Sequence, residues 1–210
     1  MNVISMEAAA HSRADSRFRI HRYPTTLIDR VRLRDGRSVT IRPVLPQDAA
    51  LQRAFVAALS PATRYRRFHG PVNELPEATL IYMTEVDYES HMALLATTID
   101  SGGQEIQVAE ARWVRREPPD STDVAEFALA VADDWQGAGL GALLLGKLAA
   151  SATAQGIRRL SGDVLADNDR MCRLLGRSGW HQTPDHFNAR LIVAQLELDA
   201  TSAERSALAA

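Results

Sequence analysis

A glycine-rich turn and an acidic residue ten positions before its start carry the residue types and spacing in this chain that suggest chemistry. The turn covers residues 136–141 (QGAGLG), between a predicted strand over 124–131 and a predicted helix over 140–154. The first N–H groups of a helix have no partner within it and lie at the positive end of its dipole. Glycines let an anion approach these donors closely. The turn is therefore predicted to bind phosphate or pyrophosphate, although a helix start without a ligand is an alternative.

Spacing separates this turn from two other phosphate-binding motifs. A Walker P-loop requires G-x-x-x-x-G-K-[ST], whereas Lys147 lies too far along the chain and is not followed by Ser or Thr. A dinucleotide fingerprint requires G-x-G-x-x-G, whereas the spacing here is G-x-G-x-G. Neither nucleotide motif fits the sequence.

The acidic residue is Glu126, in the otherwise apolar strand AEFALAV. A carboxylate in such a strand is costly unless it is functional or paired, so Glu126 is the first candidate for a general base. Glu110, in VAEARW, is the second candidate. If the intervening loop is centred on Pro118, the two carboxylates face each other across a hairpin, and their repulsion raises one of the two pKa values. A solvent-facing edge glutamate is the alternative interpretation of Glu126.

The rest of the chain has the composition of an ordinary globular domain. It has 210 residues with a formal net charge of -2, so it lacks the basic footprint of a nucleic-acid-binding protein. No apolar run is long enough to span a membrane. Cys172 is the single cysteine, which excludes an internal disulfide and favours a cytoplasmic location. We expect one domain over residues 23–199, a disordered leader over 1–22 and a flexible tail over 200–210.

Periodicity and turn signals predict the elements that position the candidate residues. Asp35-Gly36 marks a hairpin, Pro46 opens one helix, and a second helix covers 76–84. The remaining predicted strands and helices cover 92–99, 105–115, 124–131, 140–154, 158–165, the segment from Asn168 to Gly179, and 191–199. This order predicts an α/β (α+β) domain with a mixed, mostly antiparallel, twisted sheet of about six to seven strands flanked by about four helices.

The pattern (Q/R)-x-x-G-x-(G/A) at a strand-to-helix junction resembles the motif of the GNAT superfamily of acyl-CoA N-acetyltransferases, with Gln136, Gly139 and Gly141 at its fixed positions. The segment LADNDRMCRLLGRSGW resembles the second GNAT helix, which is usually written N-x-x-A-x-x-x-Y-x-x-x-G-F. Asn168 matches the Asn and Gly179-Trp180 the Gly-Phe, but Leu175 stands at the position of the usual Tyr. Leucine cannot protonate a leaving thiolate, so water or another donor must do so, or CoA leaves as the thiolate.

The resemblance implies a GNAT fold, acetyl-CoA as cosubstrate and no metal. It also implies that the turn binds the CoA pyrophosphate through backbone N–H groups, and that the edge of the preceding strand pairs with the pantetheine amides. The cofactor-binding residues implied in this way are Phe127, Ala128, Leu129, Val131, Gln136, Gly137, Ala138, Gly139, Leu140, Gly141 and Asn168. His181 and His186 lack a convincing set of partners for a metal ion.

The segments YPTTLIDRVRLRDGRSVTIRPVLPQDAALQRAFVAALSPATRYRRF, VDYESHMALLA and AEFALAVADDWQGAGLG are similar to the GNAT domain of bacterial protein lysine acetyltransferases that act on acyl-CoA synthetases. This resemblance implies that Glu126 is the catalytic glutamate and that the acceptor is a protein lysine. A small amine (a polyamine, an amino acid or an antibiotic) is an alternative acceptor, and a non-catalytic acyl-CoA sensor is a further alternative. The chain is expected to be a monomer or a homodimer. The basic run over 64–70 (RYRRFHG) is interpreted as a solvated helix end, or as a contact for an acidic protein surface or the CoA 3′-phosphate.

Overall fold

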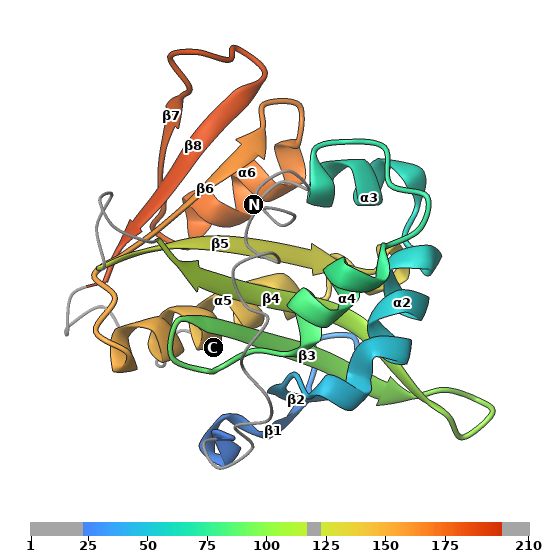
Figure 1. Ribbon diagram of the computed structural model, residues 1–210. Coiled ribbons are helices and arrows are strands. Elements are labelled where there is room, and N and C mark those ends of the chain that lie inside the picture. The colour runs from blue at the N-terminus through green and yellow to red at the C-terminus, as the bar shows by residue number, and fades with distance from the viewer. Residues whose placement is uncertain (1–22, 117–122, 199–210) are drawn as a thin grey trace.

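A computed structural model describes residues 23–116 and 123–198 of the chain (Figure 1). Within these residues, eight strands form one sheet in the order β1-β2-β3-β4-β5-β6-β8-β7. The strands are β1 Asp29–Arg32, β2 Ser38–Pro43, β3 His91–Ile99, β4 Glu105–Arg115, β5 Val124–Val131, β6 Arg159–Leu165, β7 His181–Pro184 and β8 Leu191–Glu197. The neighbouring strands are antiparallel except for β5 and β6, which are parallel. The predicted mixed, mostly antiparallel sheet is therefore confirmed.

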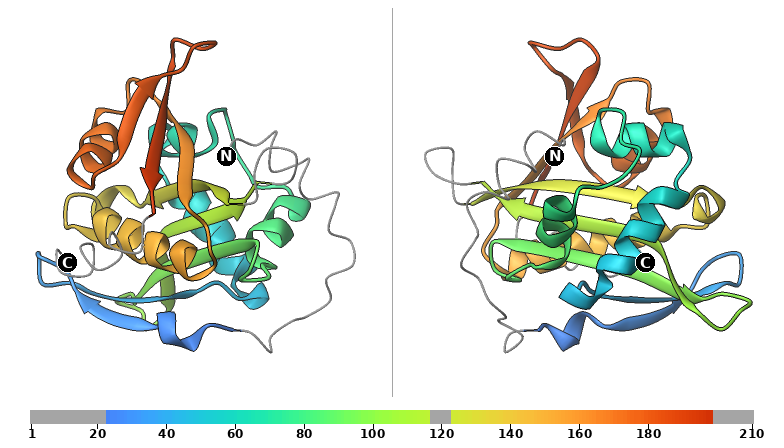
Figure 2. Two further views of the ribbon diagram at one scale, coloured as in Figure 1. Left: turned by 90° about the vertical axis from the view of Figure 1, so that its left-hand side faces the viewer. Right: turned by 45° about the vertical axis from the view of Figure 1, so that its right-hand side comes forward.

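Helices cover both faces of this sheet (Figures 1 and 2). The α-helices are α2 Ala49–Ala58, α3 Pro61–Phe68, α4 Glu77–Thr84, α5 Leu140–Ala154 and α6 Asp169–Arg177, and short 3-10 turns are η2 Thr25–Leu27, η3 Pro46–Asp48 and η4 Asp133–Trp135. Helices α2, α3 and α4 lie on one face, and α5 lies on the other. No helix in the described part of the chain is long and apolar enough to cross a membrane.

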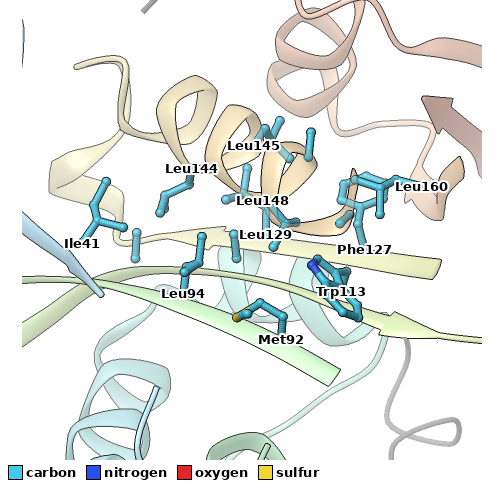
Figure 3. Close-up of a cluster of buried hydrophobic side chains, with 14 of the residues drawn as sticks. Ile41, Met92, Leu94, Trp113, Phe127, Leu129, Leu144, Leu145, Leu148 and Leu160 are labelled. Carbon is cyan, nitrogen blue, oxygen red and sulfur yellow. The ribbon is translucent and has the colours of Figure 1, made fainter. Parts of the chain in front are cut away.

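The largest hydrophobic core lies between α5 and the sheet (Figure 3). Alternate residues of β4 and β5 point into it because successive side chains of a strand face opposite sides. Trp113 is fully buried there, and its indole N–H donates to Ser151 Oγ at 2.9 Å, which satisfies its polar atom. A second core, which includes Phe55, Phe68 and Met83, joins α2, α3 and α4 to the opposite face. The central strands are thus covered on both sides.

The parallel pair β5 and β6 creates the opening in the structure. The two strands pair only from Val124 to Glu126 and from Arg159 to Ser161. Beyond these residues β6 diverges from β5, while its other edge stays paired with β8 over the whole strand (Figure 1). The β7–β8 hairpin and α6 lie at this end of the molecule (Figure 2). The divergence leaves the β6-facing edge of β5 without a strand partner over residues 127–131 in the described part of the chain.

Two elements were not predicted from the sequence, and the strand and helix numbers are higher than expected. The short strand β7 carries only four residues, and none of them is fully buried, so it has no hydrophobic period. Helix α3 was interpreted as a helix end, but it is a separate helix that Ser60 caps by accepting from Thr63 N at 3.2 Å. The predicted leader and tail boundaries lie outside the described residues.

Candidate active site

A pocket opens where β5 and β6 diverge, between α3 on one side and α6 on the other. Its lining residues are Arg66, Arg67, His69, Phe127, Ala128, Leu129, Asp163, Val164, Asn168 and Met171. Three of the residues predicted to contact the donor from the strand edge, and Asn168, belong to this lining. The unpaired strand edge and the pocket together offer room for an extended chain that could pair with β5 as a further strand.

The predicted anion-binding turn lies at the end of β5 and leads into α5. Gly137 and Gly139 have φ angles of 88° and 94°, a region that side-chain-bearing residues rarely adopt. The first recorded backbone bond of α5 runs from Leu143 N to Gly139 O. In the described part of the chain, no backbone acceptor is recorded for the N–H groups of residues 137–142. These donors at a helix N-terminus are well suited to a pyrophosphate.

The glycines of this turn serve different purposes. A Cβ on Gly137 would meet nothing within 4 Å, and a Cβ on Gly139 would meet only Arg34. Gly141, in contrast, has no positive φ, and a Cβ there would lie 3.1 Å from Leu174 Cδ2 of α6. Gly141 therefore allows α5 and α6 to pack closely, whereas Gly137 and Gly139 supply the unusual backbone conformation. Ala138 and Leu140 have buried side chains, so they can reach a donor only through their backbone.

Gln136 holds the turn in place through its side chain. Its Nε2 donates to Val131 O at 2.9 Å, and its Oε1 accepts from Arg170 on α6. The guanidinium of Arg37, from the β1–β2 hairpin, lies 3.9 Å from the ring centroid of Trp135, just before the turn. The side chain of Gln136 is thus a structural clamp, and cationic side chains from two other elements flank the turn.

Glu126 lies at the point where β5 and β6 separate. It is the last residue of β5 to pair with β6, opposite Ser161, and its side chain is half-buried. On its other side Glu126 pairs with Val114 of β4. Its side chain therefore lies on the same sheet face as Ala128, two residues further along β5, and as Arg112, which pairs with Ala128. This face points toward α3 and the pocket. Glu126 is therefore placed beside the position that the unpaired strand edge offers to a donor.

The prediction that Glu110 and Glu126 face each other is wrong. Glu110 pairs with Ala130, because the connection between β4 and β5 is centred two residues later than Pro118. Glu110 is 1% exposed, and its carboxylate contacts Arg67 at 2.9 Å and Arg112 at 2.9 Å. Burial opposes ionisation, but the two guanidinium groups outweigh it and hold the pKa of Glu110 at about 2. A carboxylate so strongly held as an ion cannot act as a general base near neutral pH.

The sequence did not indicate that Arg67 and His69, at the end of α3, lie at the pocket. Both line the pocket, and both lie close enough to Glu126 for its charge to act on them. His69 ends the helix in a left-handed conformation with φ 55°, and burial lowers its pKa below the ordinary value. The run RYRRFHG was the available signal, but it does not show which of its cations is buried.

Helix α3 is fixed by the segment that leads into the glycine turn. Asp133 accepts from Ser60 N at 3.0 Å, from Ser60 Oγ at 2.8 Å and from Thr63 Oγ1 at 2.7 Å. Partial burial opposes ionisation, but these hydrogen bonds lower the pKa of Asp133. A charged acceptor at a helix N-terminus stabilises that helix. Asp133 thereby couples the position of α3 to the turn.

The second GNAT-like segment is confirmed as a helix with a polar cap. Asn168 Oδ1 accepts from Met171 N at 3.2 Å, so the side chain caps α6 and also lines the pocket. Leu175 is completely buried, so the position of the usual tyrosine contributes only to the core. Trp180 packs against Phe127 with the rings tilted and their centroids 4.2 Å apart, which joins the end of α6 to the pocket wall.

The remaining histidines, Tyr88 and Cys172 have no contact that indicates a role in catalysis or metal binding among the described residues. Tyr88 Oη donates to Val44 O at 2.7 Å, and His91 is buried against Arg112 at 3.1 Å. His181 and His186 are exposed, and no group of three or more potential metal ligands occurs among the described residues. Cys172 is partly buried on α6, and burial raises the pKa of its thiol, which is unfavourable for a nucleophile.

The separated parallel strands, the pocket beside them and the N–H groups at the start of α5 form a site suited to an acyl-CoA donor. Residues 65–180 match the Acetyltransferase (GNAT) family, and the chain belongs to this family. It has the GNAT fold, and acetyl-CoA is the acyl donor that this family uses.

Relatives support the assignment over most of the chain. The chain is 38% identical to Acetyltransferase Pat of Mycolicibacterium smegmatis over 149 residues, which is 71% of this chain and 43% of that protein. It is 35% identical to Acetyltransferase PA5475 of Pseudomonas aeruginosa over 156 residues, which is 73% of this chain and 82% of that protein. The GNAT domain of S. lividans PAT superimposes with a TM-score of 0.77 at 30% identity, covering 84% of this chain and 99% of that domain. The chain thus spans less than half of the mycobacterial Pat that it matches.

Proposed function

We propose that the protein transfers the acetyl group of acetyl-CoA to the ε-amine of a protein lysine, with Glu126 as the general base. The observation that carries the proposal is the position of Glu126 at the separation point of β5 and β6, directly before Phe127 and Ala128 of the pocket lining. The resemblance to bacterial protein lysine acetyltransferases favours a lysine of an acyl-CoA synthetase as the acceptor. Acetyltransferase Pat, a relative of this chain, supports acetyl transfer.

In the proposed reaction, the pyrophosphate binds the N–H groups after Gln136, and the pantetheine arm pairs with the edge of β5. The thioester then lies near Phe127 and Ala128, beside Glu126. Glu126 removes a proton from the lysine ammonium, directly or through water, because only the neutral amine can attack. The nitrogen bonds to the carbonyl carbon, the carbon–sulfur bond breaks, and CoA leaves. Since Leu175 has no ionisable group, the thiolate is protonated by water or leaves as the anion.

The substitution Glu126→Gln tests the base. It retains the shape of the side chain but cannot accept a proton, so kcat should fall by about 10²- to 10⁴-fold while the dissociation constant of acetyl-CoA stays nearly unchanged. Isothermal titration with acetyl-CoA and a thiol-release assay measure the two quantities. Glu74→Gln is a matched control, because Glu74 is highly exposed. If the Glu126→Gln variant turned over near the wild-type rate, the role of Glu126 would be refuted.

A panel of acceptors separates the alternatives. Purified acyl-CoA synthetases should be acetylated on lysine, whereas polyamines, amino acids and aminoglycosides should not be turned over efficiently. Turnover of a small amine alone would replace the protein acceptor but keep the chemistry. Binding of acetyl-CoA without turnover of any acceptor would favour the sensor.

A further inference from the structure

The buried guanidinium of Arg67 uses only one of its edges within the protein. Its Nε and Nη2 lie 3.0 and 2.9 Å from Glu110 Oε1. Nη1 and Nη2 are both buried and have no hydrogen-bond partner among the described residues, although Nη2 lies within the ion pair with Glu110. The side chain is 2% exposed, so bulk water cannot readily satisfy Nη1. A buried donor without a partner is costly, and its retention calls for an explanation.

The group around Arg67 also carries surplus positive charge. Glu110 faces two guanidinium groups, because its Oε2 accepts from Arg112 Nη2 at 2.9 Å. Arg112 Nη2 also donates to Met83 O at 3.2 Å, and its Nη1 lies 3.1 Å from His91 Nε2, whereas its buried Nε has no hydrogen-bond partner among the described residues. Among Glu110, Arg67 and Arg112, one carboxylate faces two guanidinium groups. Of these two cations, Arg67 is the one that lines the pocket.

In the proposed reaction, negative charge moves from Glu126 to the thioester oxygen on the side of Arg67 that faces the pocket. Arg67 shares the pocket with Phe127 and Ala128 of β5, and the charge of Glu126 acts on it. When Glu126 accepts a proton from the amine, it loses its negative charge. At the same time the carbonyl oxygen of the thioester gains one. A fixed cation beside both groups stabilises the reacting centre throughout this exchange.

We propose that Nη1 of Arg67 donates a hydrogen bond to the carbonyl oxygen of the acyl thioester and stabilises the oxyanion formed in the reaction. As the amine nitrogen bonds to the carbonyl carbon, the π electrons move to this oxygen. They return when the carbon–sulfur bond breaks, and the electron pair of that bond leaves with CoA. The inference rests on the proposed position of the thioester beside β5, but it holds for a protein or a small-molecule amine. Arg67 would then be a catalytic residue whose ion pair with Glu110 fixes its orientation.

A measurement without any acceptor tests this contact directly. Acetyl-CoA labelled with carbon-13 at the thioester carbonyl is bound to the protein, and its carbonyl band is recorded by isotope-edited infrared difference spectroscopy. In the wild type the band should shift to lower wavenumber than in solution, because a charged donor polarises the carbonyl. The shift should be smaller in Arg67→Met and in Arg67→Lys, whose single ammonium is drawn to Glu110. Arg53→Met, on the exposed side of α2, is the control and should retain the shift.

Kinetics with a turned-over acceptor provide the second readout. Loss of one oxyanion donor should lower kcat by about 10²- to 10³-fold, with little change in the dissociation constant of acetyl-CoA. Arg67→Lys maintains a cation beside Glu110, so it keeps the test valid if Arg67→Met does not fold. If the carbonyl band of bound acetyl-CoA lay at the same wavenumber in the wild type and in both folded variants, the proposal would be overturned.

Two further outcomes are informative. If Arg67→Lys weakened the binding of succinyl-CoA but left the acetyl carbonyl band unmoved, Nη1 would pair with a carboxylate on the acyl chain, and the oxyanion role would be wrong. If Glu126→Gln retained full activity while the Arg67 variants lost both the band shift and turnover, the proposed base would fail and the oxyanion contact would stand. The two proposals are thereby distinguished.

Discussion

Replacing Glu110 by glutamine should destabilise the protein substantially, because it leaves two buried guanidinium groups without their shared counter-ion. Glu110, Arg67 and Arg112 are each at most 5% exposed and are connected by contacts of 2.9 Å. Breaking a buried ion pair by removing one partner costs about 3–5 kcal/mol. The difference between the ordinary pKa of 4.5 and the pKa of about 2 in the folded protein corresponds to about 3 kcal/mol. We therefore expect Glu110→Gln to lose about 3 kcal/mol.

The pH dependence gives this prediction a sign. The folded-state pKa of Glu110 is lowered, so its contribution is fully present above its unfolded pKa of 4.5 and is lost as the pH falls toward 2. The free-energy difference between wild type and Glu110→Gln should be constant from neutral pH down to 4.5 and should shrink only below it. A general base with a raised pKa would instead make the difference change near neutral pH.

Urea unfolding followed by tryptophan fluorescence, at a series of pH values, measures this difference. A loss of about 3 kcal/mol also lowers the melting temperature by about 6–12 °C for a domain of this size. Glu105→Gln is the matched control on the same strand, because Glu105 forms an exposed ion pair with Arg42 at 3.2 Å and should cost less than about 1 kcal/mol. A cost for Glu110→Gln no larger than that of the control, or one that fades between pH 7 and about 5.5, would refute the reasoning.

Two further substitutions test how the pocket is held. A Cβ at Gly162 would lie 2.8 Å from the ring of Phe127, so Gly162→Ala should cost about 1–3 kcal/mol and weaken acetyl-CoA binding, as unfolding and calorimetry would show. Gly146→Ala is its control within α5, where a Cβ meets nothing, and it should be neutral or stabilising; equal effects of the two would contradict the packing argument. Asp133→Ala removes three hydrogen bonds at the start of α3 and should cost about 1–2 kcal/mol. Faster amide exchange confined to α3 and the glycine turn is expected, and unchanged protection there would count against the coupling.

The parts of the site that depend on local sequence could be predicted. Gly137 and Gly139 mark a strand-to-helix turn because their backbone conformation excludes most other residues. Asn168 marks the start of α6 because a side-chain cap acts within one helical turn. The strands β3, β4 and β5 have long apolar stretches, so the predicted bounds of β4 and β5 agreed with the structure and those of β3 differed by one residue. These features depend on residues that are neighbours in the chain.

The errors arose where distant segments decide the structure. The alternation of side chains along a strand predicts the sheet face on which Glu110 lies. The residue opposite Glu110 depends instead on where the connection between β4 and β5 is centred, and the position of Pro118 did not reveal this. The charge run in α3 looked solvated because composition does not show that Arg67 meets Glu110, 43 residues away. Asp133 is likewise separated from Ser60 by 73 residues. Long-range ion pairs and hydrogen bonds of this kind leave no local pattern.

These long-range contacts explain how one fold can connect donor binding with the reacting centre. Asp133 lies just before the turn that offers its N–H groups to pyrophosphate, and it holds the start of α3. The end of the same helix carries Arg67 and His69 into the pocket. Since α3 has only eight residues, we expect a displacement at its start to reach its end, so that a donor bound at the turn would also restrain Arg67. The buried pair with Glu110 limits the remaining freedom of that guanidinium, so the position of its unpaired edge is set before an acceptor arrives.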